Sequence, residues 1–202
     1  ANSNNLGIEG EDLEGVVNAI EYIAELRQAD DKTTLPVGRD IVVIGGGMTA
    51  IDVAVQSKRL GAEQVHMVYR RGPEQMGASV FEQELAQTSG VTIHHWASPE
   101  RRLGGDHVTG IEFAVDNSDD GMRLDADVIF KAIGQNKDDG PESLEIEVGC
   151  FVVDTDQKTS MDGVWAGGDC ASGGDDLTVT AVAEGRDAAE DIHAALTGAK
   201  EA

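Results

Sequence analysis

The sequence predicts an α/β fold built around a parallel sheet, and three consecutive segments carry that prediction. Residues 41–44 form an unbroken β-branched run, as expected for a strand buried on both faces. A glycine triplet at 45–47 follows, and residues 48–60 then have the pattern of a helix that ends at Gly61. Residues 65–69 are predicted as the next strand. Together these segments have the size of a strand–helix–strand crossover, which is about 30 residues.

The remaining predicted elements flank this unit. Apolar residues on one helical stripe predict a helix over 13–29, and a second helix is predicted over 80–88. Polar turns separate the next strand candidates, which is typical of an antiparallel meander. The predicted meander strands are 91–96, 108–115 and 123–130. The C-terminal part is predicted to contain strands over 150–154 and 163–166 and a helix over 179–197.

The charge balance narrows the possible partners. The chain has 202 residues with 38 acidic and 15 basic side chains, and its formal net charge is −23. Such a surface repels nucleic acid and anionic membranes, so neither is expected as a partner. No apolar run approaches the roughly 18 residues of a membrane helix, and the polar start lacks the pattern of a secretory signal. We therefore expect a cytoplasmic protein.

Cysteine and histidine positions predict neither a metal site nor a redox motif. Cys150 and Cys170 are too far apart in sequence for a CxxC pair, and they form no zinc pattern. His94 and His95 are adjacent on a predicted strand, so their side chains point to opposite faces and cannot chelate one metal together. We expect no metal ligand among these residues.

The glycine turn fits the dinucleotide-binding pattern G-x-G-x-x-G/A, with Gly45, Gly47 and Ala50 at the small positions. Gly45 permits the tight turn, Gly47 lets the backbone approach a pyrophosphate, and Ala50 lets the helix pack close to the strand. The helix N-terminus then offers free N–H groups and partial positive charge to the anion. The pattern predicts a Rossmann-like site, and a purely structural turn is the alternative.

Two adjacent arginines end the second strand of this unit. A site for NAD usually carries an acidic residue here for the ribose 2′-hydroxyl, but no acid occurs between Val65 and Arg71. Arg70 and Arg71 stand there instead, and guanidinium groups suit a 2′-phosphate. We therefore expect NADPH rather than NADH. The alternative is a surface pair that bridges to nearby carboxylates.

A second glycine-rich motif lies near the C-terminus. Residues 163–169 (GVWAGGD) predict a strand that ends in two glycines and a carboxylate, and Thr178 and Val179 then open a helix. With IVVIGGGMTAIDVAVQSKRLGAEQVHMVYRRGPEQMGAS, AIGQ and the opening LGIEGEDLEGV, nearly the whole chain resembles the two-dinucleotide-domain flavoprotein reductases. Within that group it is similar to the glutamate synthase small-subunit family and to the flavin-reductase half of dihydropyrimidine dehydrogenase.

The resemblance implies a set of cofactor contacts. Position 48 is often Asp or Asn in such enzymes and is Met here, so only its backbone is expected to contact the cofactor. Arg70 and Arg71 would meet the 2′-phosphate. The dinucleotide would lie along Gly46, Gly47, Met48 and Thr49, the crossing between the two domains would hold Ala132, Ile133 and Gly134, and FAD would contact Gly168, Asp169, Thr178 and Val179.

The resemblance also implies two domains. Residues 1–12 would be a connector, 13–134 the NAD(P)H-binding domain, and 135–202 the C-terminal part of a FAD-binding domain. The family's earlier glycine motif for FAD does not occur in these residues, nor does the cysteine-rich iron–sulfur segment that lies upstream in many relatives. We therefore expect a fragment that binds FAD weakly or not at all, with FAD belonging to the full-length protein.

The implied activity is hydride transfer from NADPH to FAD, which feeds electrons to a redox partner subunit or domain. The cofactors supply this chemistry, so no catalytic residue is predicted and the chain alone is expected to be inactive. The electrons would serve glutamate synthesis or pyrimidine reduction. A thioredoxin reductase would need a CxxC motif, which does not occur here. A non-catalytic NAD(P)H-binding module would have no use for the GGD–helix stretch.

Overall fold

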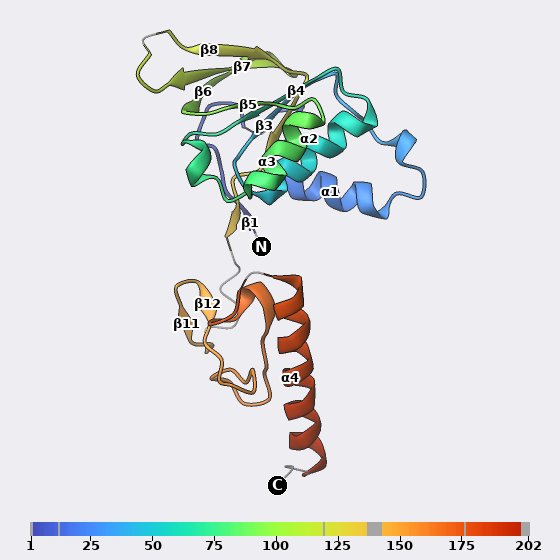
Figure 1. Cartoon of the computed structure of the whole chain (residues 1–202), viewed down its shortest axis with the longest axis vertical. Coiled ribbons are helices and arrows are strands. Elements are labelled where there is room, and N and C mark those ends of the chain that lie inside the picture. Colours follow the sequence, from blue (N-terminus) through green and yellow to red (C-terminus); the bar gives the residue numbers. More distant parts are fainter. Residues whose placement is uncertain (1, 12, 119, 137–142, 176, 199–202) are drawn as a thin grey trace. The chain divides into compact units, whose positions relative to one another are not determined.

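The computed structural model describes residues 2–11, 13–118, 120–136, 143–175 and 177–198, which belong to two compact units (Figure 1). The larger unit is Ser3–Gln135, and the smaller unit is Asn136–Ala202 together with Ala1–Asn2. Two short strands, β1 (Asn2–Ser3) and β10 (Gln135–Asn136), lie where the chain passes between the units. Within the described ranges, no helix is long and apolar enough to span a membrane.

A five-stranded parallel sheet forms the centre of the larger unit. The strand order is β2-β9-β3-β4-β5, and every neighbouring pair is parallel. The central strand β3 divides its side chains between two hydrophobic clusters, so the predicted burial on both faces is confirmed. The strands are β2 (Val16–Asn18), β3 (Asp40–Ile44), β4 (Gln64–Val68), β5 (Thr92–His94) and β9 (Val128–Lys131).

Three helices cover one face of this sheet (Figure 1). The side chain of Asn18 accepts a hydrogen bond at the start of the first helix, Gly61 ends the second with φ +112°, and Ser79 and Glu82 form a capping box on the third. The elements are α1 (Ala19–Gln28), α2 (Met48–Leu60) and α3 (Val80–Thr88), with short 3-10 turns η1 (Lys32–Thr34) and η2 (Pro73–Gln75) between them.

An antiparallel sheet covers the opposite face of the parallel sheet. It consists of β6 (Ala97–Gly104), β7 (Val108–Val115) and β8 (Met122–Asp125), in that order. Ile111 and Phe113 of β7 are completely buried and pack with the β3 side chains of the second cluster. The site described below therefore rests on a sheet that is packed on both faces.

Three element predictions for the larger unit were wrong, each because tertiary pairing overrides local preference. Residues 16–18 of the predicted helix 13–29 form β2, since their backbone pairs with β9. The predicted strand 123–130 divides into β8 and β9, which join different sheets. Strand 91–96 joins the parallel sheet as β5 instead of the meander. The meander strand β6 was missed because its sequence, ASPERRLG, is polar and has no β-branched residue.

The smaller unit contains little regular structure besides one long helix. Strands β11 (Ile146–Glu147) and β12 (Cys150–Phe151) pair antiparallel, η3 spans Gly168–Cys170, and α4 spans Thr178–Thr197. The predicted strand 163–166 makes only an isolated bridge, between Lys158 and Trp165. Ala171 is the one apolar residue of this unit that is buried among those described. The smaller unit thus has no hydrophobic core of its own in this description.

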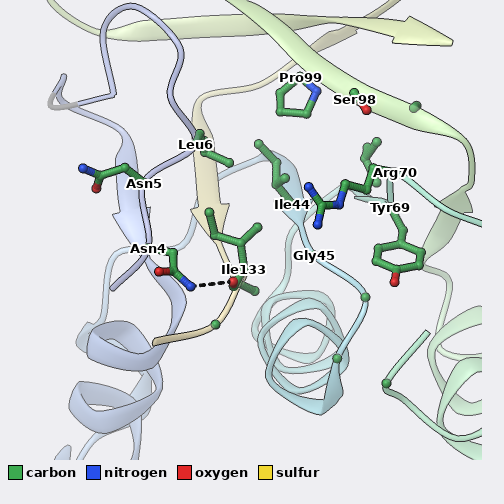
Figure 2. Close-up of a pocket in the computed structure, with 17 residues that line it drawn as sticks. Asn4, Asn5, Leu6, Ile44, Gly45, Tyr69, Arg70, Ser98, Pro99 and Ile133 are labelled. Carbon is green, nitrogen blue, oxygen red and sulfur yellow. Dashed lines mark hydrogen bonds between the residues drawn. The ribbon is translucent and has the colours of Figure 1, made fainter. Parts of the chain in front are cut away.

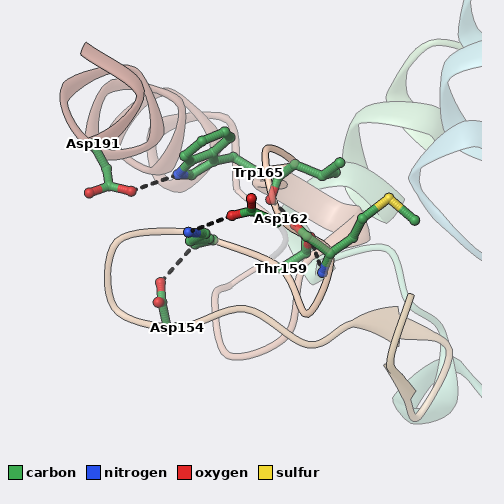
Figure 3. Close-up of polar contacts among 8 residues, drawn as sticks. Asp154, Thr159, Asp162, Trp165 and Asp191 are labelled. Atoms are coloured by element: carbon green, nitrogen blue, oxygen red, sulfur yellow. Dashed lines mark hydrogen bonds and ion pairs between the residues drawn. The ribbon is translucent and has the colours of Figure 1, made fainter. Parts of the chain in front are cut away.

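Polar contacts connect the loops of the smaller unit with α4 (Figure 3). Trp165 Nε1 donates a hydrogen bond of 2.8 Å to Asp191 Oδ2 on α4. Lys158 Nζ lies 5.7 Å from the centre of the Trp165 ring and 3.3 Å from a carboxylate oxygen of Asp162. The backbone amide of Lys158 donates to Asp154 Oδ1 at 2.9 Å. These contacts organise a loop region that apolar packing does not hold.

Candidate dinucleotide site

The three glycines between β3 and α2 meet different surroundings. A Cβ on Gly45 would collide with the Ala132 carbonyl group, and one on Gly46 would collide with the Tyr69 ring. Apart from its chain neighbours, no described residue would have an atom within 4 Å of a Cβ on Gly47. Packing within the protein therefore requires the first two glycines, whereas the third keeps open a space that the protein does not use.

The N-terminus of α2 lies beside this open space. Its N-cap Gly47 has no side chain to bond the first amides, and the first turn carries no acidic residue. The leading N–H groups of a helix lack intrahelical acceptors and carry partial positive charge. Met48 is exposed, Thr49 is half-buried, and Ala50 is completely buried, which is the close packing predicted for that position. The helix end therefore offers unpaired donors to an anion.

A cavity of about 600 Å³ lies at the carboxyl edge of the parallel sheet and includes the glycine turn (Figure 2). Its volume is in the usual range for ligand pockets. Seven predicted site residues line it: Gly45, Gly46, Gly47, Arg70, Ala132, Ile133 and Gly134. The structure thus brings together segments that follow β3, β4 and β9. Lining residues that sequence reasoning missed include Asn4, Asn5, Leu6, Tyr69, Gly77, Ser98 and Pro99.

The two arginines at the end of β4 differ in position. Arg70 lines the cavity, and in the view of Figure 2 its side chain extends toward Ile44, whereas Arg71 is not part of the lining. Both side chains are exposed. Neither forms an ion pair with any carboxylate of the described residues. The alternative of a surface pair bridged to nearby acids therefore has no support in the described part of the chain.

The N-terminal segment forms one wall of the cavity. Asn4 donates from its backbone to the Gly134 carbonyl oxygen and from its side-chain amide to the Ile133 carbonyl oxygen, both at 3.2 Å (Figure 2). Gly134 has φ +88°, a left-handed conformation that suits glycine. The predicted crossing residues are therefore held by a segment that sequence reasoning treated only as a connector. The family resemblance carried by LGIEGEDLEGV was the one sequence signal that could have indicated this role of the N-terminal segment.

One carboxylate orders this N-terminal segment. Glu11 accepts hydrogen bonds from the amides of Leu6 (2.6 Å) and Gly7 (3.1 Å), and Lys131 Nζ lies 3.0 Å from it. Burial acts to raise the pKa of Glu11, but these amides and the lysine together lower it below its usual value. Because Leu6 lines the cavity, Glu11 positions part of the cavity wall.

The residues of the second glycine motif lie in the smaller unit. Gly168 has φ +73°, and its amide donates to a carboxylate oxygen of Glu184 at 2.5 Å. Asp169 belongs to η3, and Thr178 and Val179 begin α4, whose N-terminus has neither a side-chain cap nor an acidic residue in its first turn. Sequence reasoning did not identify Glu184. The predicted site residues thus form two groups, one in each unit.

The histidines have separate surroundings and form no metal cluster in the described residues. His94 Nε2 lies 3.0 Å from His66 Nδ1 on the neighbouring strand, whereas the ring of His95 contacts Trp96. Burial lowers the pKa of both His66 and His94. Within the described ranges, no group of three or more His, Cys, Asp or Glu residues could hold a metal ion.

Comparison with known proteins identifies relatives along nearly the whole chain. A family model described as pyridine nucleotide-disulphide oxidoreductase matches residues 1–185. The glutamate synthase [NADPH] small chain of Azospirillum brasilense is 32% identical over 92% of this chain, which covers 45% of that protein. The NADP(+)-dependent formate dehydrogenase subunit beta of Moorella thermoacetica is 31% identical over 94% of this chain and 30% of its own length. The chain therefore spans less than half of these relatives.

The fold also has counterparts among solved structures. The crystal structure of T. acidophilum thioredoxin reductase aligns with a TM-score of 0.77 and 18% sequence identity, over 96% of this chain and 63% of that one. At this identity the likeness concerns the fold alone. It agrees with the predicted α/β, Rossmann-like architecture.

Proposed function

The chain belongs to the pyridine nucleotide-disulphide oxidoreductase family, and we propose that its larger unit binds NADPH and presents it for hydride transfer to FAD. The observation that carries this proposal is the open space at Gly47, beside the uncapped N-terminus of α2. No contact within the described residues requires a glycine there, but a pyrophosphate that approaches the helix amides would. The cavity in front of this turn supports the same interpretation.

The proposed preference for NADPH rests on Arg70 and Arg71. A 2′-phosphate carries the charge that distinguishes NADPH from NADH, and a guanidinium group binds phosphate through charge-assisted hydrogen bonds. Both side chains are exposed, and neither is paired with a described carboxylate, so both can accept such a ligand. In a chain with net charge −23, phosphate binding needs such a local source of positive charge.

We further propose that Gly168, Asp169, Thr178 and Val179 contribute to a FAD site in the full-length protein. The N-terminus of α4 has no side-chain cap and no acidic residue in its first turn, which suits an anionic cofactor group. FAD would supply the acceptor for the nicotinamide hydride, and the protein would orient the cofactors and exclude water. Because the smaller unit buries so little apolar surface in this description, we expect weak FAD binding by the 202-residue chain.

The proposed electron acceptor is a redox partner subunit or domain, as expected for a protein similar to glutamate synthase small chains. The support is the similarity to the Azospirillum protein of that name and to a beta subunit of formate dehydrogenase. An iron–sulfur cluster upstream of the FAD part would fit such a route. Electron transfer into pyrimidine reduction is the alternative of the same class.

A calorimetric titration of the chain with NADPH, NADH and FAD tests the proposal. We expect saturable NADPH binding, weaker NADH binding and negligible FAD binding. FAD binding without any nicotinamide response would mean that the Gly45–Gly47 turn serves the other dinucleotide. If none of the three cofactors binds to the folded chain, the proposed function is wrong for this cavity.

A further inference from the structure

We propose that Trp96 is the surface on which the adenine ring of the bound dinucleotide stacks. The inference rests on the proposed function, because it takes the 2′-phosphate to lie at Arg70 and Arg71. Trp96 follows β5, its side chain is 50% exposed, and its backbone has φ +57°. A bulky residue rarely adopts this left-handed conformation, and Asn, Asp or Gly would occupy it with less strain.

Hydrogen bonds place Trp96 beside the arginine loop. The amide of Tyr69 donates to the His94 carbonyl oxygen at 2.9 Å, and the amide of Ala97 donates back to Tyr69 at 3.2 Å. In addition, the amide of Trp96 donates a hydrogen bond to the Arg71 carbonyl oxygen at 3.3 Å. The segments that follow β4 and β5 therefore continue side by side beyond the ends of the strands.

The indole ring itself lies against this loop. A Cβ on Gly72 would be 2.8 Å from Glu74 Oε2, 3.2 Å from Trp96 Cζ2 and 3.3 Å from Trp96 Nε1, so the indole ring and the Glu74 carboxylate both lie beside the backbone after Arg71. The His95 ring lies at 5.6 Å from the Trp96 ring, centre to centre. The three residues that follow Trp96 along the chain, Ala97, Ser98 and Pro99, line the cavity.

The chemistry of the ligand connects these observations. In NADPH the adenine and the 2′-phosphate are attached to adjacent carbons of one ribose, so a phosphate at Arg70 and Arg71 requires the purine to lie next to that loop. A half-exposed indole beside Arg71 meets the requirement, because purines stack on aromatic side chains. Tyr69 is less suited, since its ring packs on Gly46 and its hydroxyl donates to Gln75 at 2.7 Å. Residues with such backbone strain are enriched at active sites and ligand-binding sites.

The substitution Trp96→Asn separates stacking from folding. Asparagine tolerates a left-handed backbone, and this relief of strain opposes the loss of the indole contacts with Gly72 and His95, so the variant should remain folded at the temperature of the titration. The Kd for NADPH should increase at least about fivefold, the lower end of the effect of removing one base–aromatic stack. Trp96→Phe is the matched control, because it keeps an aromatic surface and should retain most of the affinity. Adenosine 2′,5′-bisphosphate should show the same pattern as NADPH, and reduced nicotinamide mononucleotide should show none.

Fluorescence gives an independent readout. The chain has two tryptophans, so a Trp165→Phe variant leaves Trp96 as the sole source of tryptophan emission when excitation avoids tyrosine absorption. Adenosine 2′,5′-bisphosphate, which has no nicotinamide ring, should quench this emission on binding. Equal affinities of wild type and Trp96→Asn, or unchanged emission at saturation, would overturn the stacking role and leave the proposed function standing. A wild-type chain that binds neither NADPH nor the bisphosphate would overturn both.

Discussion

Replacing Gly47 with alanine should weaken NADPH binding without unfolding the protein. Gly47 has φ −99° and ψ −179°, which any residue adopts, and apart from its chain neighbours no atom of the described residues would lie within 4 Å of a Cβ there. Alanine is a poorer N-cap than glycine by about 0.5–1 kcal/mol, whereas its lower unfolded-state entropy contributes about 0.4–1 kcal/mol in the opposite direction. The free energy of unfolding should therefore change by less than about 1 kcal/mol, or roughly 3 °C in Tm.

The expected loss of binding is much larger than this change in stability. The added methyl group would stand where the pyrophosphate approaches the first amides of α2. Losing one charge-assisted hydrogen bond costs about 1.5–3 kcal/mol, which corresponds to a roughly 10- to 150-fold increase in Kd. Methyl groups elsewhere on the helix would not have this effect, because only the N-terminal amides lack acceptors within the helix.

The matched control is Gly45→Ala, two residues away. Its Cβ would lie 2.8 Å from the carbonyl carbon of Ala132 and even closer to the oxygen, so the strands must move apart. Overpacking of this kind costs about 1–3 kcal/mol, and Tm should fall by several degrees. Thermal denaturation and calorimetric titration of both variants give the two readouts. If Gly47→Ala is folded and binds NADPH as tightly as wild type, the pyrophosphate does not lie at this helix end.

Three other predictions use the charged groups of the larger unit. Replacing Arg70 and Arg71 together with alanine should raise the Kd for NADPH at least about tenfold but hardly change that for NADH; an equal loss for both cofactors in calorimetry would exclude a 2′-phosphate contact. Burial lowers the pKa of His66 and His94 below the ordinary 6.5, so the unfolded chain binds more protons than the folded chain as the pH falls. The contribution of the two neutral histidines to the free energy of unfolding is therefore fully present above pH 6.5 and is lost as the pH falls through their folded-state pKa values. Tm measured at a series of pH values should show that loss, and His94→Gln should reduce the slope; an unchanged slope would show that other groups cause it. The pKa of Glu11 is lowered from 4.5, so its contribution is likewise present above that pH and lost on acidification. Glu11→Gln should therefore lower Tm at pH 7 and weaken NADPH binding through the displaced cavity wall, and a variant with unchanged Tm and affinity would contradict the positioning role of this carboxylate.

Local sequence was sufficient to predict a helix or strand wherever the interactions that define the element lie within a few residues of chain. The strand before the glycine turn, helix α2 with its Gly61 end, and helix α3 all appear as predicted, and the structure adds the Ser79 cap of α3. Each depends on an uninterrupted apolar pattern or on a cap formed within a few residues of chain. Those patterns were enough to predict the position of the glycine turn.

Other elements depended on which strands paired, and the prediction failed for them. Val16 and Val17 suit a helical stripe as well as a strand, and only their pairing with β9 makes them a strand. The polar strand β6 exists because β7 offers it hydrogen-bond partners. The pairing of β2 with β9 joins segments far apart in the sequence. The pairing of β6 with β7 is a local hairpin, but the residue types of β6 do not indicate a strand.

The sequence by itself determined the chemistry of the candidate site: a glycine turn at a helix end, two arginines at the next strand, and a family resemblance that the family model bears out. Only the tertiary structure decided which glycine has open space in front of it, because the packing of Ala132 and Tyr69 occupies the space beside the other two. The tertiary structure also placed Trp96 beside Arg71. Residues 25 positions apart meet there because β4 and β5 run parallel and their ends lie at the same edge of the sheet.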